Sequence, residues 1–174
     1  MEDFLDPNQF LNQLDLSPDM IAADFGCGSG GWAIPLAKKL KEGKVYAIDI
    51  LEEPLSVLKS RVAGERMLNL QAVRGNVEEK GGSKMTDSSM DLVLMTNLLF
   101  QAEDKKGAVA EAVRVLKRGG RILIIDWLPE SILGPKDGRI SAKEVKEISK
   151  EYDLRTENEF EAGAYHYGLI LKKV

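Results

Sequence analysis

The chain has 174 residues, of which 44% are hydrophobic and 30% charged, and its net charge at pH 7 is −4. This length and balance predict one globular domain, 1–174, with its own hydrophobic core, and exclude a disordered or membrane-embedded chain. The acidic balance also disfavours nucleic acid as a substrate, because proteins that bind phosphate backbones usually carry a basic surface.

The cysteine content and the N-terminus bear on location. A single cysteine excludes a disulfide within the chain and a metal site built from several cysteines. Residues 1–4 are acidic and lack the apolar core of a signal peptide, and no apolar run reaches transmembrane length. We therefore expect a cytoplasmic protein with no membrane partner.

Strand-like and helix-like segments alternate along the chain. Amphipathic runs predict helices at 7–16, 32–40, 53–63, 104–116 and 141–152, the last with Ser141 and Glu144 as a capping box. Apolar or alternating runs predict strands at 21–25, 44–50, 70–74, 91–96, 121–126, 154–160 and 165–172. Gly119 and Gly120 predict a turn before the fifth strand, and Gly163 joins the last two strands.

This order of segments predicts a doubly wound α/β fold, in which a seven-stranded, mostly parallel sheet ends in an antiparallel hairpin. The strands at 91–96 and 121–126 are apolar almost throughout, as is expected of strands that are buried on both faces. A nicotinamide-binding Rossmann fold usually closes with a sixth parallel strand instead. The sequence shows no internal repeat and no second domain.

The sequence Asp-Phe-Gly-Cys-Gly-Ser-Gly-Gly, which begins at Asp24, connects the first strand to the following helix. A glycine-rich turn at this place lets the main chain approach a nucleotide and directs helix N–H groups toward it. Gly26, Gly28 and Gly31 fit the dinucleotide fingerprint G-x-G-x-x-G. Asp24 with Gly26, Gly28 and Gly30 fits D-x-G-x-G-x-G, which resembles the first motif of class I S-adenosylmethionine methyltransferases.

Two acidic residues bear on the choice between these patterns. Asp24 lies two residues before the first glycine, where its carboxylate would face the ligand crevice beyond the strand ends. It would attract the ammonium and sulfonium of S-adenosylmethionine and repel a pyrophosphate; the alternative is that it caps the helix turn. Asp49 ends the second strand, where a carboxylate can accept both ribose hydroxyls of either cofactor.

Four further stretches resemble class I methyltransferases of the methyltransferase-11 and ubiquinone/menaquinone-biosynthesis type. They are 45–49, 74–78, 90–94 and 115–121, and they occur in that family's order and spacing over nearly the whole chain from Phe4. A reversed last strand is also typical of that family. The resemblance implies methyl transfer from S-adenosylmethionine, with S-adenosylhomocysteine as the product.

The resemblance also implies which residues bind the cofactor. Gly26, Gly28 and Gly30 would form the loop at the methionine side, and Asp49, followed by Ile50, would hold the ribose. Asn76 would meet the adenine amino group, with Val77 beside the ring, and Asn97 and Leu98 would line the cofactor where the fourth strand ends. The family usually carries Asp at position 76; an Asn carbonyl accepts without charge assistance, and Asn76 could instead only shape a turn.

Methyl transfer from a sulfonium mainly requires that donor and acceptor be positioned, and a base is needed only when the acceptor loses a proton. At the carboxyl edge of the sheet, Asp126 is a candidate for substrate binding or catalysis, and Trp127 for a substrate wall or core. His166 is the only histidine, and a pKa of about 6.5 would suit proton transfer. A structural role for His166 is the alternative.

Other chemistries fit less well. We expect no metal: metal-dependent relatives need acidic ligands at the ends of the fourth and fifth strands, and Asp126 could be one, but Thr96 and Trp127 occupy the neighbouring places. Asn97 is not followed by Pro-Pro-Tyr, which disfavours methylation of adenine or glutamine. We expect a small-molecule acceptor, bound by one chain or across a homodimer. The alternatives are a nicotinamide-dependent oxidoreductase, for which the chain lacks the Tyr-x-x-x-Lys pair of short-chain dehydrogenases, and a non-catalytic nucleotide-binding domain.

Overall fold

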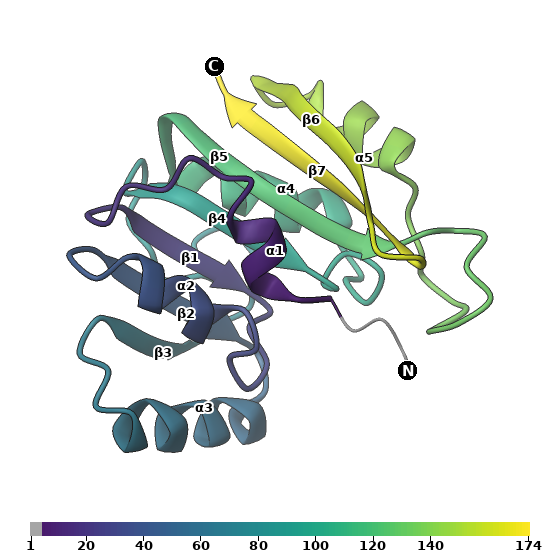
Figure 1. The fold of residues 1–174 in the computed structure, drawn as a ribbon. Helices are drawn as coiled ribbons and strands as arrows, with labels where there is room; N and C mark the ends of the chain where they lie inside the picture. The colour runs from purple at the N-terminus through teal and green to yellow at the C-terminus, as the bar shows by residue number, and fades with distance from the viewer. Residues whose placement is uncertain (1–4) are drawn as a thin grey trace.

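The computed structural model describes residues 5–174, so the acidic start at 1–4 lies outside the described residues. Its strands are β1 (Ile21–Phe25), β2 (Lys44–Asp49), β3 (Leu70–Arg74), β4 (Met90–Thr96), β5 (Leu116–Trp127), β6 (Leu154–Ala162) and β7 (His166–Lys173). Its helices are α1 (Pro7–Leu11), α2 (Ala33–Lys39), α3 (Glu52–Gly64), α4 (Lys105–Val115) and α5 (Ala142–Ser149) (Figure 1). In this part of the chain, no helix has both the length and the apolar character needed to span a membrane.

The strands form one sheet in the order β3-β2-β1-β4-β5-β7-β6. Neighbouring strands from β3 to β5 pair in parallel, whereas β7 runs antiparallel to both β5 and β6. The predicted α/β architecture with a C-terminal hairpin is therefore confirmed. Because β6 runs in the same direction as β5, the turn between β6 and β7 lies at the carboxyl edge of the sheet.

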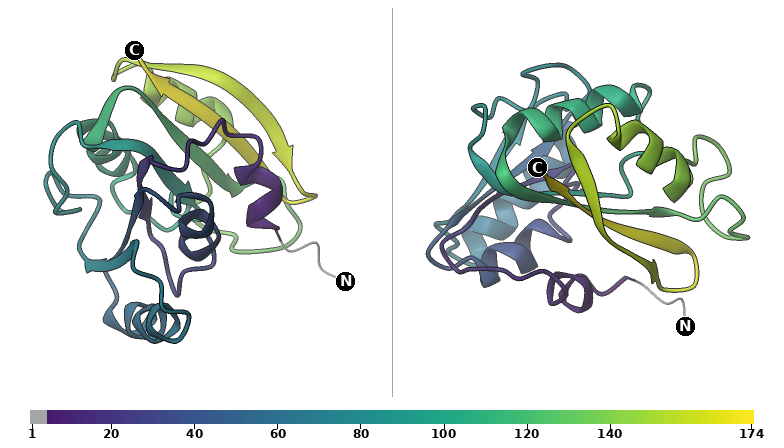
Figure 2. Two further views of the ribbon diagram at one scale, coloured as in Figure 1. Left: turned by 60° about the vertical axis from the view of Figure 1, so that its left-hand side comes forward. Right: turned by 90° about the horizontal axis from the view of Figure 1, so that it is seen from above.

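Helices cover both faces of the sheet, and each face has its own hydrophobic core (Figure 2). On one face, Phe10 of α1, Leu36 of α2 and Leu58 of α3 are buried in the same cluster. On the other face, Val109 of α4 and Val145 of α5 are buried against the sheet. Burying each of these side chains contributes about 1.5–3 kcal/mol, so the two cores fix the sheet whose edge carries the site.

Two helices end earlier than predicted. The N-terminal helix ends at Leu11 and not at 16, although Leu14 is buried with it as expected. Polar residues with low helix propensity follow Leu11, so only the Asp6 cap and the buried apolar side chains hold this short helix. The helix after Ser141 has the predicted capping box but ends at Ser149, short of 152.

The fifth strand begins earlier than predicted, at Leu116, so the Gly-Gly pair lies inside β5 and not in a turn before it. Met90 pairs with Leu116 and Leu92 with Arg121, so β5 has extra residues opposite β4 and bulges there. Gly119 has φ +81°, a conformation that glycine adopts without strain. The glycines correctly indicated a backbone conformation that other residues rarely adopt, but turns and bulges both use this conformation.

Candidate functional site

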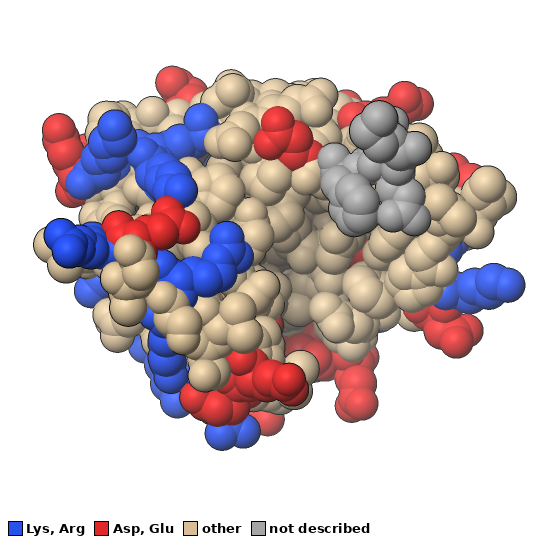
Figure 3. Space-filling model, turned by 60° about the horizontal axis from the view of Figure 1, so that its bottom comes forward, with Lys and Arg blue, Asp and Glu red and all other residues tan. Residues whose placement is uncertain are grey.

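A cavity of about 330 Å³ opens at the carboxyl edge of the sheet, where β1, β2, β3 and β4 end. This volume lies within the range of small-molecule sites. Figure 3 views the molecule from the side of α3 and shows a hollow near its centre whose walls are mostly uncharged. The cavity is lined by seven of the ten residues predicted to bind the cofactor: Gly26, Gly28, Asp49, Ile50, Asn76, Val77 and Leu98.

The loop after β1 has the backbone that the D-x-G-x-G-x-G pattern requires. Gly26, Gly28 and Gly30 have φ angles of +71°, +54° and +94°, where only glycine is unstrained. A Cβ on Gly30 would come within 2.4 Å of Leu58 Cδ1, whereas one on Gly31 would meet no described atom within 4 Å. The loop therefore needs glycine at 30 and not at 31, which favours the methyltransferase pattern over the dinucleotide fingerprint.

Asp24 lies fully buried beneath this loop and does not itself line the cavity. Neither of its carboxylate oxygens has a hydrogen-bond partner among the described residues. Burial, followed by the charge of Asp49, raises its pKa from 3.8 to about 8, and the nearby N–H of Ala33 offsets this only in part. Since Trp32, and not Asp24, is the N-cap of α2, the carboxylate is free to compensate a cation such as the ammonium of S-adenosylmethionine.

Asp49 ends β2 at the cavity wall and already holds two backbone groups. Its Oδ2 accepts a hydrogen bond from the N–H of Gly28 at 2.9 Å, and its Oδ1 accepts one from the N–H of Leu51 at 3.0 Å. Each carboxylate oxygen has a second lone pair, so both can still accept a ribose hydroxyl. Asp49 therefore lines the cavity and also fixes the position of the glycine loop.

The residues after β3 and β4 form the other side of the cavity. Asn76 Oδ1 accepts from the N–H of Glu78 at 3.1 Å, so this side chain shapes a turn and lines the cavity as well. Val77 and Leu98 are buried and present apolar surface to the cavity. A Cβ on Gly26 would lie 2.8 Å from Leu98 Cδ1, so glycine lets the two walls approach closely.

Asn97 does not line the cavity in this structure. Its φ of +50° is unusual for a residue other than glycine, and its buried Oδ1 has no hydrogen-bond partner among the described residues. Sequence reasoning missed further lining residues, among them Leu51, Pro54 and Gln101. All three lie within five residues of the end of β2 or β4, and this nearness in the chain was the available signal.

Asp126 is fully buried and bonded to the backbone. Its Oδ2 accepts from the N–H groups of Leu99 and Phe100 at 2.9 and 3.3 Å, and its Oδ1 accepts from that of Trp127 at 2.8 Å. Burial raises the pKa of Asp126 to about 6, against the lowering effect of these hydrogen bonds. Asp126 thus holds the segment that begins with the cavity residue Leu98.

His166 begins β7 and pairs with Trp127 at the carboxyl edge. The two ring centroids lie 4.1 Å apart, and His166 Nε2 is buried without a hydrogen-bond partner among the described residues. Burial lowers the pKa of His166 to about 4, so the imidazole is neutral at pH 7. Asp126 pairs with Tyr167 instead, and because side chains alternate along strands, the sheet places Asp126 and His166 on opposite faces.

No group of three or more His, Cys, Asp or Glu side chains within residues 5–174 is placed to hold a metal ion. The requirement for a divalent ion is therefore a matter for experiment.

A family model for the methyltransferase domain matches residues 23–124. The chain belongs to this family. The matched part contains the glycine loop, Asp49, Asn76 and β4, which are the elements that build the cavity. The family, the sheet order and the glycine loop are those of a class I S-adenosylmethionine-dependent methyltransferase, and its methyl donor is S-adenosylmethionine.

Relatives and solved structures agree with this assignment. The demethylmenaquinone methyltransferases of Bacillus mycoides (strain KBAB4) and Bacillus cereus (strain ATCC 10987 / NRS 248) are 29% and 30% identical over 128 residues, which cover 73% of this chain and 53% of each relative. The chain thus spans about half the length of these methyltransferases. A SAM-dependent methyltransferase from Aquifex aeolicus has 26% identity and a TM-score of 0.88, and the match covers 98% of this chain and 90% of that chain.

Proposed function

We propose that this methyltransferase transfers the methyl group of S-adenosylmethionine to a small-molecule acceptor. The observation that carries the proposal is the buried carboxylate of Asp24, which has no partner among the described residues and lies beneath the glycine loop. Ionising a buried carboxyl group without a partner is costly, so Asp24 keeps its proton in the free protein, and a bound cation at the loop would stabilise its ionised form. A pyrophosphate at the same loop would not.

In this proposal, different cavity residues bind different parts of the donor. Asp49 accepts the ribose hydroxyls, and Val77 and Leu98 pack against the faces of the adenine ring. Asn76 accepts from the adenine amino group with the lone pair that its turn hydrogen bond leaves free. Asn97 directly precedes the cavity residue Leu98, and its buried Oδ1, which has no hydrogen-bond partner among the described residues, accepts from the donor. When bound, the donor supplies a methyl group on a sulfonium, and the leaving group is a neutral thioether.

His166 and Asp126 are the proposed residues on the acceptor side. His166 is neutral at pH 7 and its Nε2 has no hydrogen-bond partner among the described residues, so it can take a proton from an acceptor that must lose one. Trp127, whose ring lies tilted against that of His166, provides an aromatic wall. Asp126 acts by holding the turn after β4, because its described hydrogen bonds all go to the backbone.

The residues at the same edge of the sheet also indicate the chemical class of the acceptor. The curated relatives are named for demethylmenaquinone, and for this chain we propose only an apolar small molecule. Trp127 and the exposed Ile132 and Leu133, in the loop that follows β5, supply apolar surface for it. A cytoplasmic location is part of the proposal and is supported by Cys27, whose free thiol suits a reducing compartment.

Labelled methyl transfer tests the function directly. The purified protein is incubated with S-adenosylmethionine labelled on the methyl group and with a cell extract separated into small-molecule and macromolecular fractions. We expect label in a small molecule together with an equal amount of S-adenosylhomocysteine. Label found only in the macromolecular fraction would contradict the acceptor class, and no S-adenosylhomocysteine from either fraction would contradict the activity.

A further inference from the structure

The segment between β3 and β4, residues 75–89, forms no helix or strand, yet it builds one wall of the cavity. Its first four residues, 75–78, all line the cavity. Lys84 and Ser88 have φ angles of +63° and +51°, which side-chain-bearing residues rarely adopt. A backbone of this kind persists only where the surrounding structure holds it.

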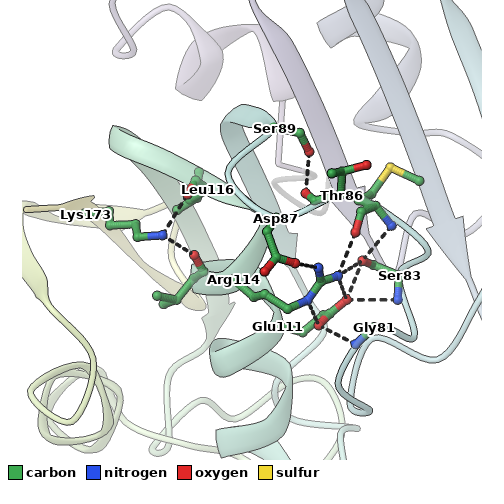
Figure 4. Close-up of polar contacts among 11 residues, drawn as sticks. Gly81, Ser83, Thr86, Asp87, Ser89, Glu111, Arg114, Leu116 and Lys173 are labelled. Carbon is green, nitrogen blue, oxygen red and sulfur yellow. Dashed lines mark hydrogen bonds and ion pairs between the residues drawn. The ribbon is translucent and has the colours of Figure 1, made fainter.

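Glu111 of α4 holds the middle of this segment from below (Figure 4). Its side chain is fully buried. Oε2 accepts from the N–H of Gly81 at 2.9 Å, and Oε1 accepts from the N–H and the hydroxyl of Ser83 at 3.1 and 2.5 Å. Burial alone would raise the pKa of Glu111, but the hydrogen bonds from Arg114 and Ser83 outweigh it and hold the pKa at about 2.

Arg114 lies one turn along α4 and completes the cluster. It donates to both oxygens of Glu111, at 2.8 Å from Nε and 2.7 Å from Nη2. Nη2 also donates to the carbonyl of Met85 at 2.8 Å, and Nη1 pairs with Asp87 (Figure 4). Since both partners of the ion pair are bonded to the 75–89 segment, the segment can shift only if several buried charge-assisted hydrogen bonds break.

The part of the segment that Glu111 holds lies directly against the part that lines the cavity. A Cβ on Gly82 would lie 1.8 Å from the carbonyl oxygen of Asn76, and one on Gly75 would lie 2.2 Å from the carbonyl oxygen of Gly82. Glycine is therefore required at 82 for the two backbones to approach. A displacement of residues 81–83 must move Asn76 as well.

A second hydrogen-bonded contact joins the same wall of the cavity to the beginning of α4. The carboxylate of Glu78, a cavity residue, accepts from the N–H of Asp104 at 2.6 Å. Asp104 in turn caps α4 by accepting from the N–H of Gly107 at 2.8 Å. The helix therefore holds the wall at two points, near its start and near Glu111.

We propose that the Glu111–Arg114 pair is a positioning device for the adenine side of the cofactor site. The pair does not line the cavity. It fixes the backbone of residues 81–83, which fixes Asn76, and Asn76 then meets the exocyclic group of the purine. The pair thereby sets the preference for adenine over other purines. This inference rests on the proposed use of the cavity for S-adenosylmethionine.

The test measures purine discrimination by calorimetric titration with S-adenosylhomocysteine and with S-inosylhomocysteine, which carries a carbonyl in place of the amino group. We expect the wild-type protein to bind the adenine compound at least about tenfold more tightly, the equivalent of about 1.4 kcal/mol. Glu111→Gln should reduce this ratio to about threefold or less, because an amide has one acceptor oxygen, so its NH2 group must face the N–H of either Gly81 or Ser83. Glu157→Gln is the matched control, because Glu157 of β6 also forms an ion pair with an arginine, Arg121 of β5, at 2.6 Å.

A purely structural role predicts a different result. In that case Glu111→Gln would lower the melting temperature while the ratio of the two affinities stayed as in the wild type, and the inference would be wrong. Ser83→Ala removes the 2.5 Å hydroxyl bond to Glu111 and the longer contacts of the same hydroxyl with Met85 and Arg114, and it is used if Glu111→Gln does not fold. A ratio in Ser83→Ala that equals the wild-type ratio overturns the inference, and so does a wild-type protein that binds the two compounds equally. If the wild-type protein binds neither compound, the proposed function itself fails.

Discussion

The N–H of Gly28 donates a 2.9 Å hydrogen bond to Oδ2 of Asp49, linking the glycine loop after β1 to the end of β2. Asp49 is the residue predicted to hold the ribose, and the loop is predicted to hold the methionine end of the donor. The two halves of the cofactor site therefore depend on a single carboxylate. Its loss should affect the whole site and not the ribose contact alone.

Asp49→Ala should weaken the binding of S-adenosylhomocysteine by well over tenfold. The change removes the two ribose contacts and also leaves the N–H groups of Gly28 and Leu51 without their acceptor. Calorimetric titration measures the effect. Asp153→Asn is a suitable control, because Asp153 is exposed and precedes β6 at the opposite edge of the sheet. Equal affinity in Asp49→Ala and wild type would exclude Asp49 from the site.

The stability of the free protein should fall as the pH rises from about 6.5 to 8. Burial, followed by the charge of Asp49, raises the pKa of Asp24 from 3.8 to about 8, so the folded chain keeps a proton that the unfolded chain has lost. The free energy of unfolding then decreases with pH in this window. Asp126 and His166, with pKa values of about 6 and 4 in the folded chain, change the slope mainly at lower pH.

Asp24→Asn, which is neutral at every pH, isolates this contribution. Its melting temperature should change less between pH 6.5 and 8 than that of the wild type, as followed by circular dichroism in matched buffers. Parallel curves for the two proteins would show that Asp24 is already ionised in the free protein.

The two glycine patterns predict opposite results at neighbouring positions. Gly30→Ala should destabilise the protein by more than about 1–2 kcal/mol, because φ is +94° there and the new Cβ would lie 2.4 Å from Leu58 Cδ1. Gly31→Ala should change stability by no more than about 0.5 kcal/mol, because its Cβ would meet no described atom within 4 Å. Urea unfolding compares the two variants, and the reverse order would support the dinucleotide pattern.

His166→Ala should lower turnover by about 10²–10⁴-fold if the acceptor loses a proton, while the affinity for S-adenosylhomocysteine stays within about twofold. The imidazole lies beside Trp127 and does not line the cofactor cavity. His166→Gln keeps a polar group of similar reach and serves as the comparison. Turnover that is unchanged in both variants, on an acceptor found by labelling, would remove His166 as the base.

Two short strands were predictable from the sequence. β1 and β3 have the predicted bounds, 21–25 and 70–74, because each is mainly apolar and is followed directly by a glycine, Gly26 or Gly75. The glycine loop and Asp49 were predictable for a similar reason, since the loop directly follows β1 and Asp49 is the last residue of β2. The bulge in β5 was not, because the Gly-Gly pair that permits it also fits a turn, and only the pairing with β4 distinguishes the two.

Contacts between distant segments left no pattern in the sequence. Glu111 lies about thirty residues beyond Gly81, in a helix where its charge would ordinarily indicate a solvent-facing side. Similarly, nothing local showed that both oxygens of Asp126 would be taken up by backbone N–H groups. Such roles follow from tertiary packing, which periodicity and motifs do not encode.

Thermal unfolding with added ligands tests the central claim, that the cavity beside Asp49 binds S-adenosylmethionine. The melting temperature is measured with S-adenosylmethionine, S-adenosylhomocysteine, NAD and NADP at equal concentration. A ligand that binds the folded state alone raises the melting temperature by an amount that grows with the ratio of its concentration to its dissociation constant. We predict a rise with the first two compounds and none with NAD or NADP. A rise with NAD or NADP alone would contradict the account.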